Sequence, residues 1–279
     1  VPFTIAVASE DDLTAALGSV RYPCIVKPAV RTSRFRRNVA EKVFHVRSQR
    51  QLLELYRRLA QWEPEMVIQE WIEGGDDRIA YCLACYGRSG EPLALYPGRK
   101  LRQYPVDHGV TAVAAPAPPE WREALTRLTD SMFRDLGYRG LGSVEYKMRP
   151  DGSPVIMEPT VGRTNWQSEI AVVNGINIPY LAYSDLAGVP CPPMREAPRD
   201  VKLVDGRGHR RASLQLMKQG RFRLRDWLSE RRGTKRYMLW RTDDPSPFLA
   251  AALVAPVRRV LRRARTNLGR FVVKRTAIR

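Results

Sequence analysis

Residues 143–158, Ser143-Val-Glu-Tyr-Lys-Met-Arg-Pro-Asp-Gly-Ser-Pro-Val-Ile-Met-Glu158, predict a β-hairpin. The first six residues alternate as a strand does, the next five have the composition of a tight turn, and the last five form the returning strand. With the turn centred on Asp151-Gly152, Glu145 and Glu158 become direct cross-strand neighbours. The hairpin therefore predicts two carboxylates side by side on one face.

Two like charges at opposed positions of a sheet destabilise it, so a chain that folds this way should supply a positive charge between them. A hard divalent ion such as Mg²⁺ fits best, because it takes oxygen ligands, usually one or two carboxylates together with substrate phosphates. The alternative is that the strands lie at an edge, where each glutamate faces water or pairs with a nearby arginine. The hairpin alone leaves both interpretations open.

Helices that cover a sheet are predicted at three places. Capping patterns at Ser9 and Ser48 indicate two helix starts, and the first of these helices should end near Gly18. A longer helix from Pro119 to Leu136 should stop at Gly137. We expect its apolar stripe to lie in the core, and that stripe consists of Leu125, Leu128, Met132 and Leu136.

The order of several elements resembles the ATP-grasp superfamily. A lysine ends an apolar strand over Tyr22–Pro28, a second strand over Met66–Gly74 runs into an acidic segment, a further lysine follows near position 100, and the two hairpin glutamates come last. Three further segments resemble the carboxylate–amine ligase branch, namely Gly98-Arg-Lys-Leu-Arg-Gln-Tyr-Pro105, Glu158-Pro-Thr-Val-Gly-Arg163 and Asn174-Gly-Ile-Asn-Ile-Pro-Tyr-Leu-Ala-Tyr183. The resemblance covers roughly residues 1–190.

The resemblance implies an α+β fold of the ATP-grasp type, in which two α+β lobes grip ATP. The smaller lobe would span about residues 1–70 and the larger lobe about residues 71–190, followed by a basic C-terminal extension over residues 191–279. Relatives carry a further α/β domain before the first strand, and we expect that domain to be absent from this chain.

Nucleotide-binding roles follow from the same resemblance. Lys27 and Lys42 match lysines that contact the ATP phosphates, although Lys27 could instead reach the surface and Lys42 could pair with its neighbour Glu41. Residues Gln69, Glu70 and Ile72 match the linker whose backbone reads the adenine edge. Either Asp76 or Asp77 would bind the ribose hydroxyls, unless this Asp-Asp pair is a solvated loop tip.

The catalytic and metal roles are also implied by the resemblance. Lys100 matches a lysine that meets the γ phosphate, and Glu145 and Glu158 would hold Mg²⁺, with Mn²⁺ as the alternative ion. Thr160 stands where the family usually has an asparagine that completes the metal shell. Relatives often have an arginine where this chain has Ser143, and Arg163 is the residue that could compensate.

The implied activity is an ATP-dependent ligation of a small-molecule carboxylate to a small-molecule amine through an acyl phosphate. Three departures from the family keep an alternative open, a catalytically degenerate ATP-binding module. They are Thr160, the expected absence of the front domain, and the loop over residues 29–38, which holds four arginines and no glycine where relatives are glycine-rich. Those arginines could clamp phosphate or an anionic substrate, or could belong to a flexible basic loop.

Composition limits the remaining classes. The 279 residues are 44% hydrophobic, which is enough for a substantial core, and no apolar run approaches the roughly 20 residues that span a bilayer. We expect three of the four cysteines to be buried, which suits a reducing cytoplasm. Three histidines in no triad-like context argue against Ser-His chemistry.

Positive charge is concentrated near the C-terminus. Residues 195–279 hold 24 Lys and Arg against 7 Asp and Glu, whereas residues 1–194 hold 23 against 22. Residues 257–273 alternate apolar and arginine faces at helical spacing, which predicts a basic amphipathic helix. Through residues 245–279 the chain could meet an anionic membrane surface, peripherally on the inner face, or an acidic partner; nucleic acid is the less favoured partner. Its apolar stripe could equally pack on the protein.

Overall fold

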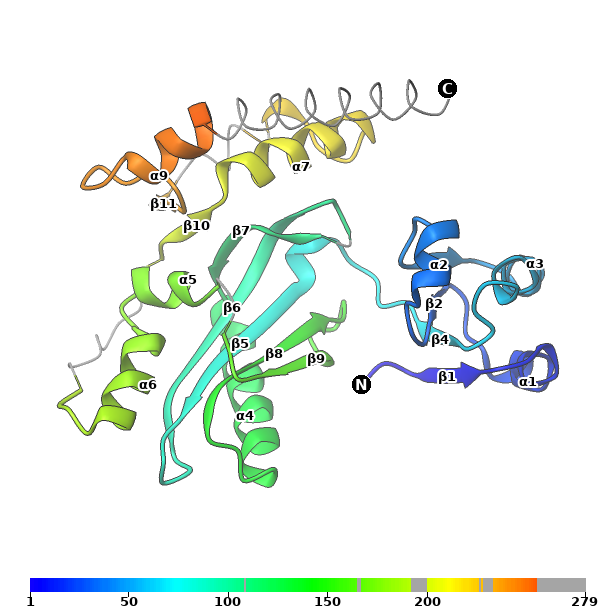
Figure 1. Ribbon diagram of the computed structural model, residues 1–279, viewed down its shortest axis with the longest axis horizontal. Coiled ribbons are helices and arrows are strands. Elements are labelled where there is room, and N and C mark those ends of the chain that lie inside the picture. Colours follow the sequence, from blue (N-terminus) through cyan, green and yellow to red (C-terminus); the bar gives the residue numbers. More distant parts are fainter. Residues whose placement is uncertain (108, 165–166, 192–199, 226, 228–232, 255–279) are drawn as a thin grey trace, which may run out of the picture. The chain divides into compact units, whose positions relative to one another are not determined.

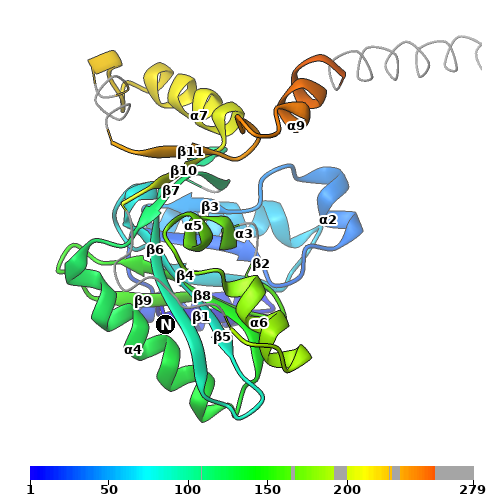
Figure 2. The ribbon, with the colours of Figure 1, turned by 90° about the vertical axis from the view of Figure 1, so that its left-hand side faces the viewer.

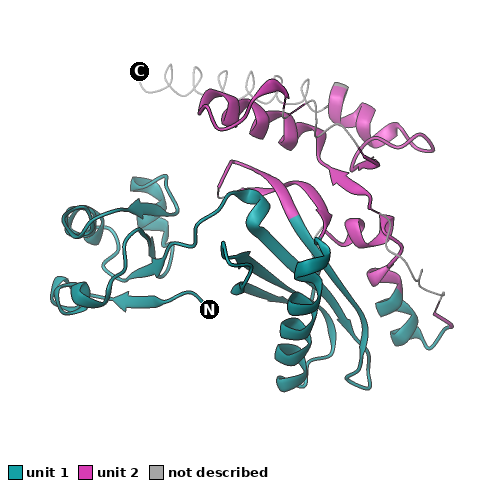
Figure 3. Cartoon of the chain, turned by 180° about the vertical axis from the view of Figure 1, so that it is seen from behind, with its two compact units in different colours: residues 1–99, 117–164, 181–189 teal, residues 100–116, 165–180, 190–279 magenta. Residues whose placement is uncertain are grey.

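The computed structural model describes residues 1–107, 109–164, 167–191, 200–225, 227 and 233–254. The chain forms two compact units, which Figure 3 shows in two colours. Unit 1 contains residues 1–99, 117–164 and 181–189, and unit 2 contains residues 100–116, 165–180 and 190–279. Because the chain passes several times between the units, each is described by itself.

Unit 1 begins with a four-stranded antiparallel sheet in the order β1-β4-β2-β3. Its strands are β1 (Thr4–Val7), β2 (Cys24–Pro28), β3 (Phe44–Val46) and β4 (Met66–Glu70). Between them lie α1 (Glu10–Ala16), η1 (Leu17–Ser19), α2 (Ser33–Asn38) and α3 (Gln49–Ala60). The buried side chains of α3, Leu52, Leu55, Tyr56 and Leu59, recur at helical spacing and pack in one core with the sheet.

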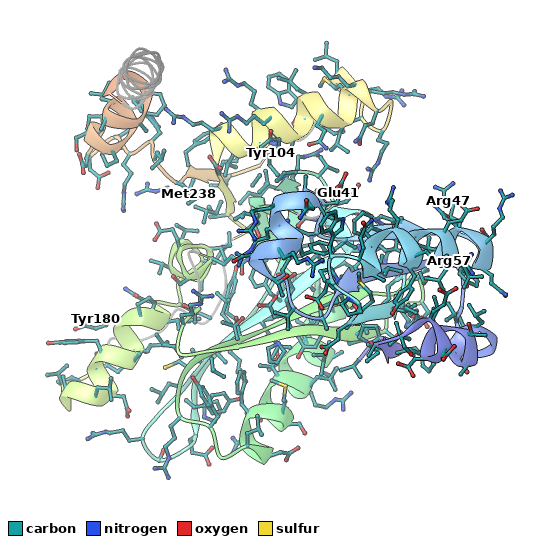
Figure 4. The ribbon with its side chains drawn as sticks, turned by 45° about the vertical axis from the view of Figure 1, so that its right-hand side comes forward. Glu41, Arg47, Arg57, Tyr104, Tyr180 and Met238 are labelled. Atoms are coloured by element: carbon teal, nitrogen blue, oxygen red, sulfur yellow. The ribbon has the colours of Figure 1, made fainter. Side chains whose placement is uncertain are left out.

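Both predicted helix caps in this part of the chain are confirmed. The Ser9 hydroxyl accepts a hydrogen bond from the backbone N–H of Asp12, and the Ser48 hydroxyl accepts one from Gln51. On the outer surface Arg57 of α3 pairs with Glu10 of α1 at 2.6 Å, and Figure 4 labels Arg57 between these two helices. The first lobe is therefore a sheet packed with helices, and serine side chains fix the starts of α1 and α3.

The second sheet has seven strands in the order β11-β10-β7-β6-β5-β8-β9. In chain order its strands are β5 (Ile79–Tyr86), β6 (Pro92–Tyr104), β7 (Val110–Pro116), β8 (Gly140–Met148), β9 (Pro154–Val161), β10 (Lys202–Val204) and β11 (Lys235–Tyr237). The short helix η2 (Asp76–Arg78) precedes β5. β10 and β11 run parallel, and the pairs β5–β6, β5–β8, β8–β9 and β7–β10 are antiparallel.

One face of the unit 1 part of this sheet is covered by α4 (Pro119–Asp135), which Figure 1 shows against β5 and β8. Trp121, Leu125 and Phe133 of α4 share a core with even-numbered residues of the two strands, such as Cys82 and Val144. Since successive strand residues point to opposite faces, the odd-numbered residues of β5 and β8 lie on the face away from α4.

The predicted start and stop of α4 are confirmed, but the prediction that Leu136 belongs to its buried apolar stripe is wrong. Leu136 is 69% exposed, whereas Trp121, Thr129 and Phe133 are buried with Leu125. Gly137 ends the helix with φ 57°. Leu136 follows the last helical residue, so it no longer shares the buried face.

Unit 2 contains short helices around the far strands. They are α5 (Ser168–Val173), the start of α6 (Ile178–Ala187), α7 (Gly206–Lys218), α9 (Ser246–Leu249) and η3 (Ala250–Val254). Wholly buried Asn174 donates to the carbonyls of Ile170 and Val201 and accepts from the N–H of Val201, which ties α5 to the segment before β10. The boundary near residue 190 stays a prediction. The predicted helix over 257–273 lies outside the described residues.

Cys24, Cys82 and Cys85 are buried, which confirms the expected burial of three cysteines, and Cys191 is exposed. None of the four forms a disulfide. Burial raises the pKa of the Cys82 thiol to about 12, so this group is a small apolar filler and not a nucleophile. Within the described part of the chain, no helix is both long and apolar enough to cross a membrane.

Candidate functional site

The hairpin glutamates are opposed as predicted, since β8 and β9 pair with Glu145 directly across from Glu158. The turn differs from the prediction, because Met148 faces Pro154 and the turn is therefore centred on Asp151 alone. Asp151 Oδ1 accepts hydrogen bonds from the backbone and hydroxyl of Ser153. Continuing that register would set Glu158 opposite Val144.

A β-bulge corrects the register between the turn and the glutamates. Tyr146 pairs with Ile156 and Glu145 pairs with Glu158, so Met157 is the extra residue in β9. Met157 is 42% exposed. The bulge moves Glu158 by one position and brings it across from Glu145, so the opposition of the two carboxylates is built into the strand pairing.

Four oxygen-bearing side chains form a block on one face of the hairpin. Ser143 pairs with Thr160 as Glu145 pairs with Glu158, and residues two apart on a strand point to the same side. Ser143 and Glu145 are odd-numbered β8 residues, so this is the face of the sheet away from α4. Ser143 is buried, Glu145 and Thr160 are half-buried, and Glu158 is exposed.

This block fits a hard divalent cation. Two carboxylates and two hydroxyls supply the oxygen ligands that Mg²⁺ takes, and substrate phosphates commonly complete its shell. Among the residues that the structure describes, Glu158 has no ion-pair partner, and no group of three or more His, Cys, Asp or Glu side chains is placed so that it could hold a metal ion by itself. The remaining ligands of such an ion would therefore come from a bound substrate or water.

A buried tyrosine flanks Glu145 in the next strand. β5 sets Tyr81 beside both Glu145 of β8 and Gly98 of β6, so the row Gly98–Tyr81–Glu145–Glu158 crosses the sheet. The Tyr81 side chain covers the Gly98 Cα so closely that a Cβ there would lie 2.5–2.6 Å from two ring carbons and the phenol oxygen. Burial, with neighbouring Tyr96 and Glu145, raises the pKa of Tyr81 well above its ordinary value, so the phenol stays neutral.

Two basic residues of the hairpin hold the first lobe and the linker, and the sequence analysis missed both. Lys147 Nζ donates to the carbonyls of Gly74 and Gly75 at 2.7 and 2.8 Å. Arg149 forms a two-bonded ion pair with Glu70, with N–O distances of 2.7 and 3.1 Å. Lys147 lies two residues from Glu145 on one strand, so strand alternation could have placed it on the glutamate face.

Two of the predicted nucleotide-binding residues come together in the first lobe. Lys27 lies near the end of β2, half-buried, and its Nζ donates to Gln69 Oε1 at 3.4 Å. The Gln69 amide also donates to the Thr4 hydroxyl at 3.0 Å. Lys42 is exposed in the segment between α2 and β3. Their predicted roles toward phosphate and adenine stay predictions.

The linker residues differ in how much of each side chain is available. The Arg149 guanidinium beside Glu70 holds the pKa of that carboxyl below its ordinary value, so this side chain is committed to the ion pair. Ile72 is buried. Asp76 is 8% exposed and Asp77 is exposed, which distinguishes two residues that the sequence left equivalent. A ribose contact at the surface would favour Asp77, and one within the fold would favour Asp76.

The basic segment over residues 29–38 is partly helical, since α2 begins at Ser33 and is capped by Thr32, whose hydroxyl accepts from the N–H of Phe35. Arg31 donates to the Ala40 carbonyl, and Arg34 donates to the Gln61 carbonyl and lies 5.7 Å from the Trp62 ring centre. These two arginines serve the fold of the first lobe. Arg36 and Arg37 are exposed in the last turn of α2.

The remaining catalytic candidates lie on β6 and after β9. Lys100 is 6% exposed in unit 2, and alternation along β6 puts it on the same side of the strand as Gly98. Arg102, also in unit 2, is 5% exposed and lies 4.1 Å from the ring centre of Phe222, so it is packed beneath an aromatic side chain. Arg163 is exposed just after Gly162.

Comparison with curated proteins finds two D-alanine–D-alanine ligases. One, from Anaeromyxobacter sp. (strain Fw109-5), is 26% identical over 194 residues, which cover 67% of this chain and 59% of the relative. The other, from Laribacter hongkongensis (strain HLHK9), is 24% identical over 162 residues, which cover 57% of this chain and 50% of the relative. This chain therefore spans between half and three fifths of their length. No protein-family model matches it.

Solved structures show the fold independently of sequence. An N5-carboxyaminoimidazole ribonucleotide synthetase in complex with ADP superposes with a TM-score of 0.57 at 15% identity, covering 78% of this chain and 55% of that one. A biotin carboxylase from Campylobacter jejuni gives a TM-score of 0.53 at 16% identity, covering 71% and 45%. Both neighbours belong to the ATP-grasp superfamily. The chain therefore has the α+β ATP-grasp fold, and it is similar in sequence to the carboxylate–amine ligases of that superfamily.

Proposed function

We propose that this chain is an ATP-dependent ligase that joins a small-molecule carboxylate to an amine. The observation that carries the proposal is the opposition of Glu145 and Glu158 on the sheet face away from α4. Like charges at directly opposed positions destabilise a sheet, so the opposition of these two carboxylates needs a functional reason. The sequence relatives, two D-alanine–D-alanine ligases, support a carboxylate and an amine as the substrates.

In this proposal the hairpin block holds the cation that accompanies ATP. Glu145 and Glu158 are its ligands, with Thr160 as a further oxygen ligand. When bound, the ion would neutralise developing charge on the phosphate oxygens. Lys147 keeps the Gly74–Gly75 backbone fixed through its two hydrogen bonds, so the linker proposed to read the adenine edge at Gln69, Glu70 and Ile72 is held in place.

The phosphates would be bound by lysines. Lys27, already oriented by Gln69, and exposed Lys42 would contact the α and β phosphates, and Lys100 would meet the γ phosphate. Asp76 or Asp77 would bind the ribose. A substrate carboxylate would attack the γ phosphorus, ADP would leave, and the amine would displace phosphate from the resulting acyl phosphate. Arg163 would hold a carboxylate or phosphate oxygen. Positioning and charge stabilisation would supply most of the rate enhancement.

Release of ADP tests the proposal. The purified chain would be incubated with ATP, Mg²⁺ and a panel of carboxylates and amines that starts with D-alanine as both substrates. We expect ADP release that needs both substrates, and at least a hundredfold loss of it in a Glu158→Gln variant. A Glu54→Gln variant is the matched control, because it removes one exposed carboxylate from α3.

Binding of Mg-ATP, measured in the same samples by calorimetry, separates a missing substrate from a missing activity. Mg-ATP binding without ADP release across the panel would support the nucleotide site and would reject the ligase activity for those substrates. Full-rate ADP release by the Glu158→Gln chain would overturn the proposed role of the hairpin.

A further inference from the structure

A cavity lies in unit 2, and none of its lining residues belongs to the proposed nucleotide site. Its volume is about 880 Å³, within the range of small-molecule sites. It is formed by the first turns of α7, by the end of β11 and the segment that follows it, and by α9 with the start of η3, which lie side by side in Figures 1 and 2. No activity proposed above uses it.

One wall of the cavity carries three arginines. They are Arg207, Arg210 and Arg211, which lie in the first half of α7, and all three are exposed. Arg207 donates to the carbonyl of Ala251, and Arg211 lies 5.7 Å from the ring centre of Tyr104, which Figure 4 shows beneath α7. Among the described residues none of the three has a carboxylate partner.

One acidic side chain lines the cavity, and it is committed to the helix. Asp205 caps α7, and its Oδ1 accepts from the backbone N–H of Arg207 at 3.1 Å. The cavity therefore keeps a net positive charge, at the end of a helix where the backbone dipole also favours an anion.

Three aromatic side chains also line the cavity. Tyr237, Trp240 and Phe248 line it with 44%, 45% and 41% of each residue exposed, and the rings of Trp240 and Phe248 meet edge to face with centres 5.1 Å apart. Large side chains that gather while remaining exposed mark a binding surface more often than a fold requirement. Arginine forks and aromatic rings that line one cavity suit a molecule with an anionic head and an apolar body.

We propose that this cavity binds a small anionic amphiphile, namely an apolar or aromatic body that carries a phosphate, sulfonate or carboxylate. The arginines would hold the head and the rings would hold the body. The C-terminal tail does not suit this cavity, because residues 255–279 contain nine Lys and Arg and no acidic residue. The head could belong to a soluble metabolite or to a membrane lipid, and both offer the same chemistry.

The probe for this site is 8-anilinonaphthalene-1-sulfonate, an aromatic anion whose fluorescence rises in apolar surroundings. In titrations of the full chain we expect saturable binding that Arg210→Gln and Trp240→Ala each weaken by about tenfold or more, the usual scale of one lost charge-assisted contact. Arg210→Lys should bind at an intermediate level. Arg50→Gln, which removes a 90%-exposed positive charge from α3, should bind as the unchanged chain does.

Two further arms make the result decisive. Excess Mg-ATP should leave the probe bound. If Mg-ATP displaced the probe from every variant, the probe would be bound at the nucleotide site and the proposal would be overturned. Equal probe binding by the unchanged chain and by both weakened variants would overturn it as well. Sedimentation with phosphatidylglycerol vesicles identifies the source: retention lost in Arg210→Gln and Trp240→Ala assigns a lipid head, whereas probe binding lost with retention unchanged assigns a soluble ligand.

Discussion

A methyl group added at Gly98 should disrupt the row that ends in the glutamate pair. The Cβ of a Gly98→Ala variant would lie 2.5 and 2.6 Å from two ring carbons of Tyr81 and 2.6 Å from its phenol oxygen, where ordinary contacts are 3.4–4 Å. Tyr81 is 1% exposed, so its ring is enclosed by the protein and cannot move away into solvent. Overpacking of this kind costs about 1–3 kcal/mol, and this overlap of about 1 Å favours the upper half of that range.

Urea unfolding of the unchanged and variant chains measures the cost. Gly18→Ala is the matched control, because nothing lies within 4 Å of its added Cβ and its φ is not left-handed, so this variant should be as stable as the unchanged chain or slightly more stable. Tyr81→Leu combined with Gly98→Ala should cost less than the sum of the two single changes, because the smaller side chain relieves the overlap.

The same variant tests the link to the site. Displacement of the Tyr81 ring would shift β8 at Glu145, so Gly98→Ala should also weaken Mg-ATP binding by several fold at temperatures where the chain is still folded. If Gly98→Ala unfolds at the same urea concentration as Gly18→Ala, and the double change shows no compensation, the packing of Tyr81 over Gly98 described above is wrong.

Three further predictions concern charges. Glu70→Gln should lower the free energy of unfolding by about 1–2 kcal/mol at pH 7, because it breaks a two-bonded and partly buried ion pair with Arg149. The pair lowers the pKa of Glu70 and is lost on protonation, so the difference from the unchanged chain should shrink as pH falls below 4.5. A difference in unfolding free energy that is the same at pH 3 and pH 7 contradicts this. Burial, with Arg102 next in effect, lowers the pKa of His209 from 6.5 to about 4. Between these pH values the unfolded chain binds more protons than the folded chain, so the free energy of unfolding should fall as pH drops from 6.5 to 4. The loss is at most about 3 kcal/mol, reduced by solvent screening, and His209→Gln should flatten this part of a stability–pH curve. In EDTA, Glu158→Gln should raise the free energy of unfolding by about 0.2–1 kcal/mol because it removes a like-charge pair, and a destabilised variant would mean that Glu158 makes favourable contacts in the free chain.

The sequence predicted the opposition of the two glutamates although it placed the turn incorrectly. Turn chemistry at Asp151-Gly152 suggested a symmetric turn, but the Asx-type bonds of Asp151 to Ser153 centre it one half-step away. The bulge at Met157 cancels the difference. A bulge depends on how both strands meet the rest of the sheet, so single-sequence patterning gives no sign of it.

Local sequence signals were sufficient to predict where helices begin and end, and which face of the sheet a strand residue occupies. Ser9, Ser48 and Gly137 mark helix ends through short-range geometry, and each lies where its pattern predicts. Leu136 was misplaced because apolar spacing alone does not show where the last turn leaves the core. Lys147 was overlooked, although alternation from Glu145 would have put both on one face.

The rest of the site depends on contacts between distant segments. The pairing of Arg149 with Glu70 joins residues 79 positions apart, and only that contact shows that the Glu70 side chain is unavailable to a ligand. Burial separates Asp76 from Asp77 for the same reason. The cavity of unit 2 is built by α7, the segment after β11 and α9, which the sequence presented only as a basic region.

The metal linkage of ATP binding tests the central claim most directly. Calorimetry would compare the dissociation constant of ATP in EDTA and in Mg²⁺ for the unchanged chain, for a Glu145→Gln/Glu158→Gln double variant and for the Glu54→Gln control. We predict that Mg²⁺ tightens ATP binding at least about tenfold for the unchanged chain and the control, and leaves it unchanged for the double variant. A double variant whose ATP binding responds to Mg²⁺ as the unchanged chain does would contradict the account.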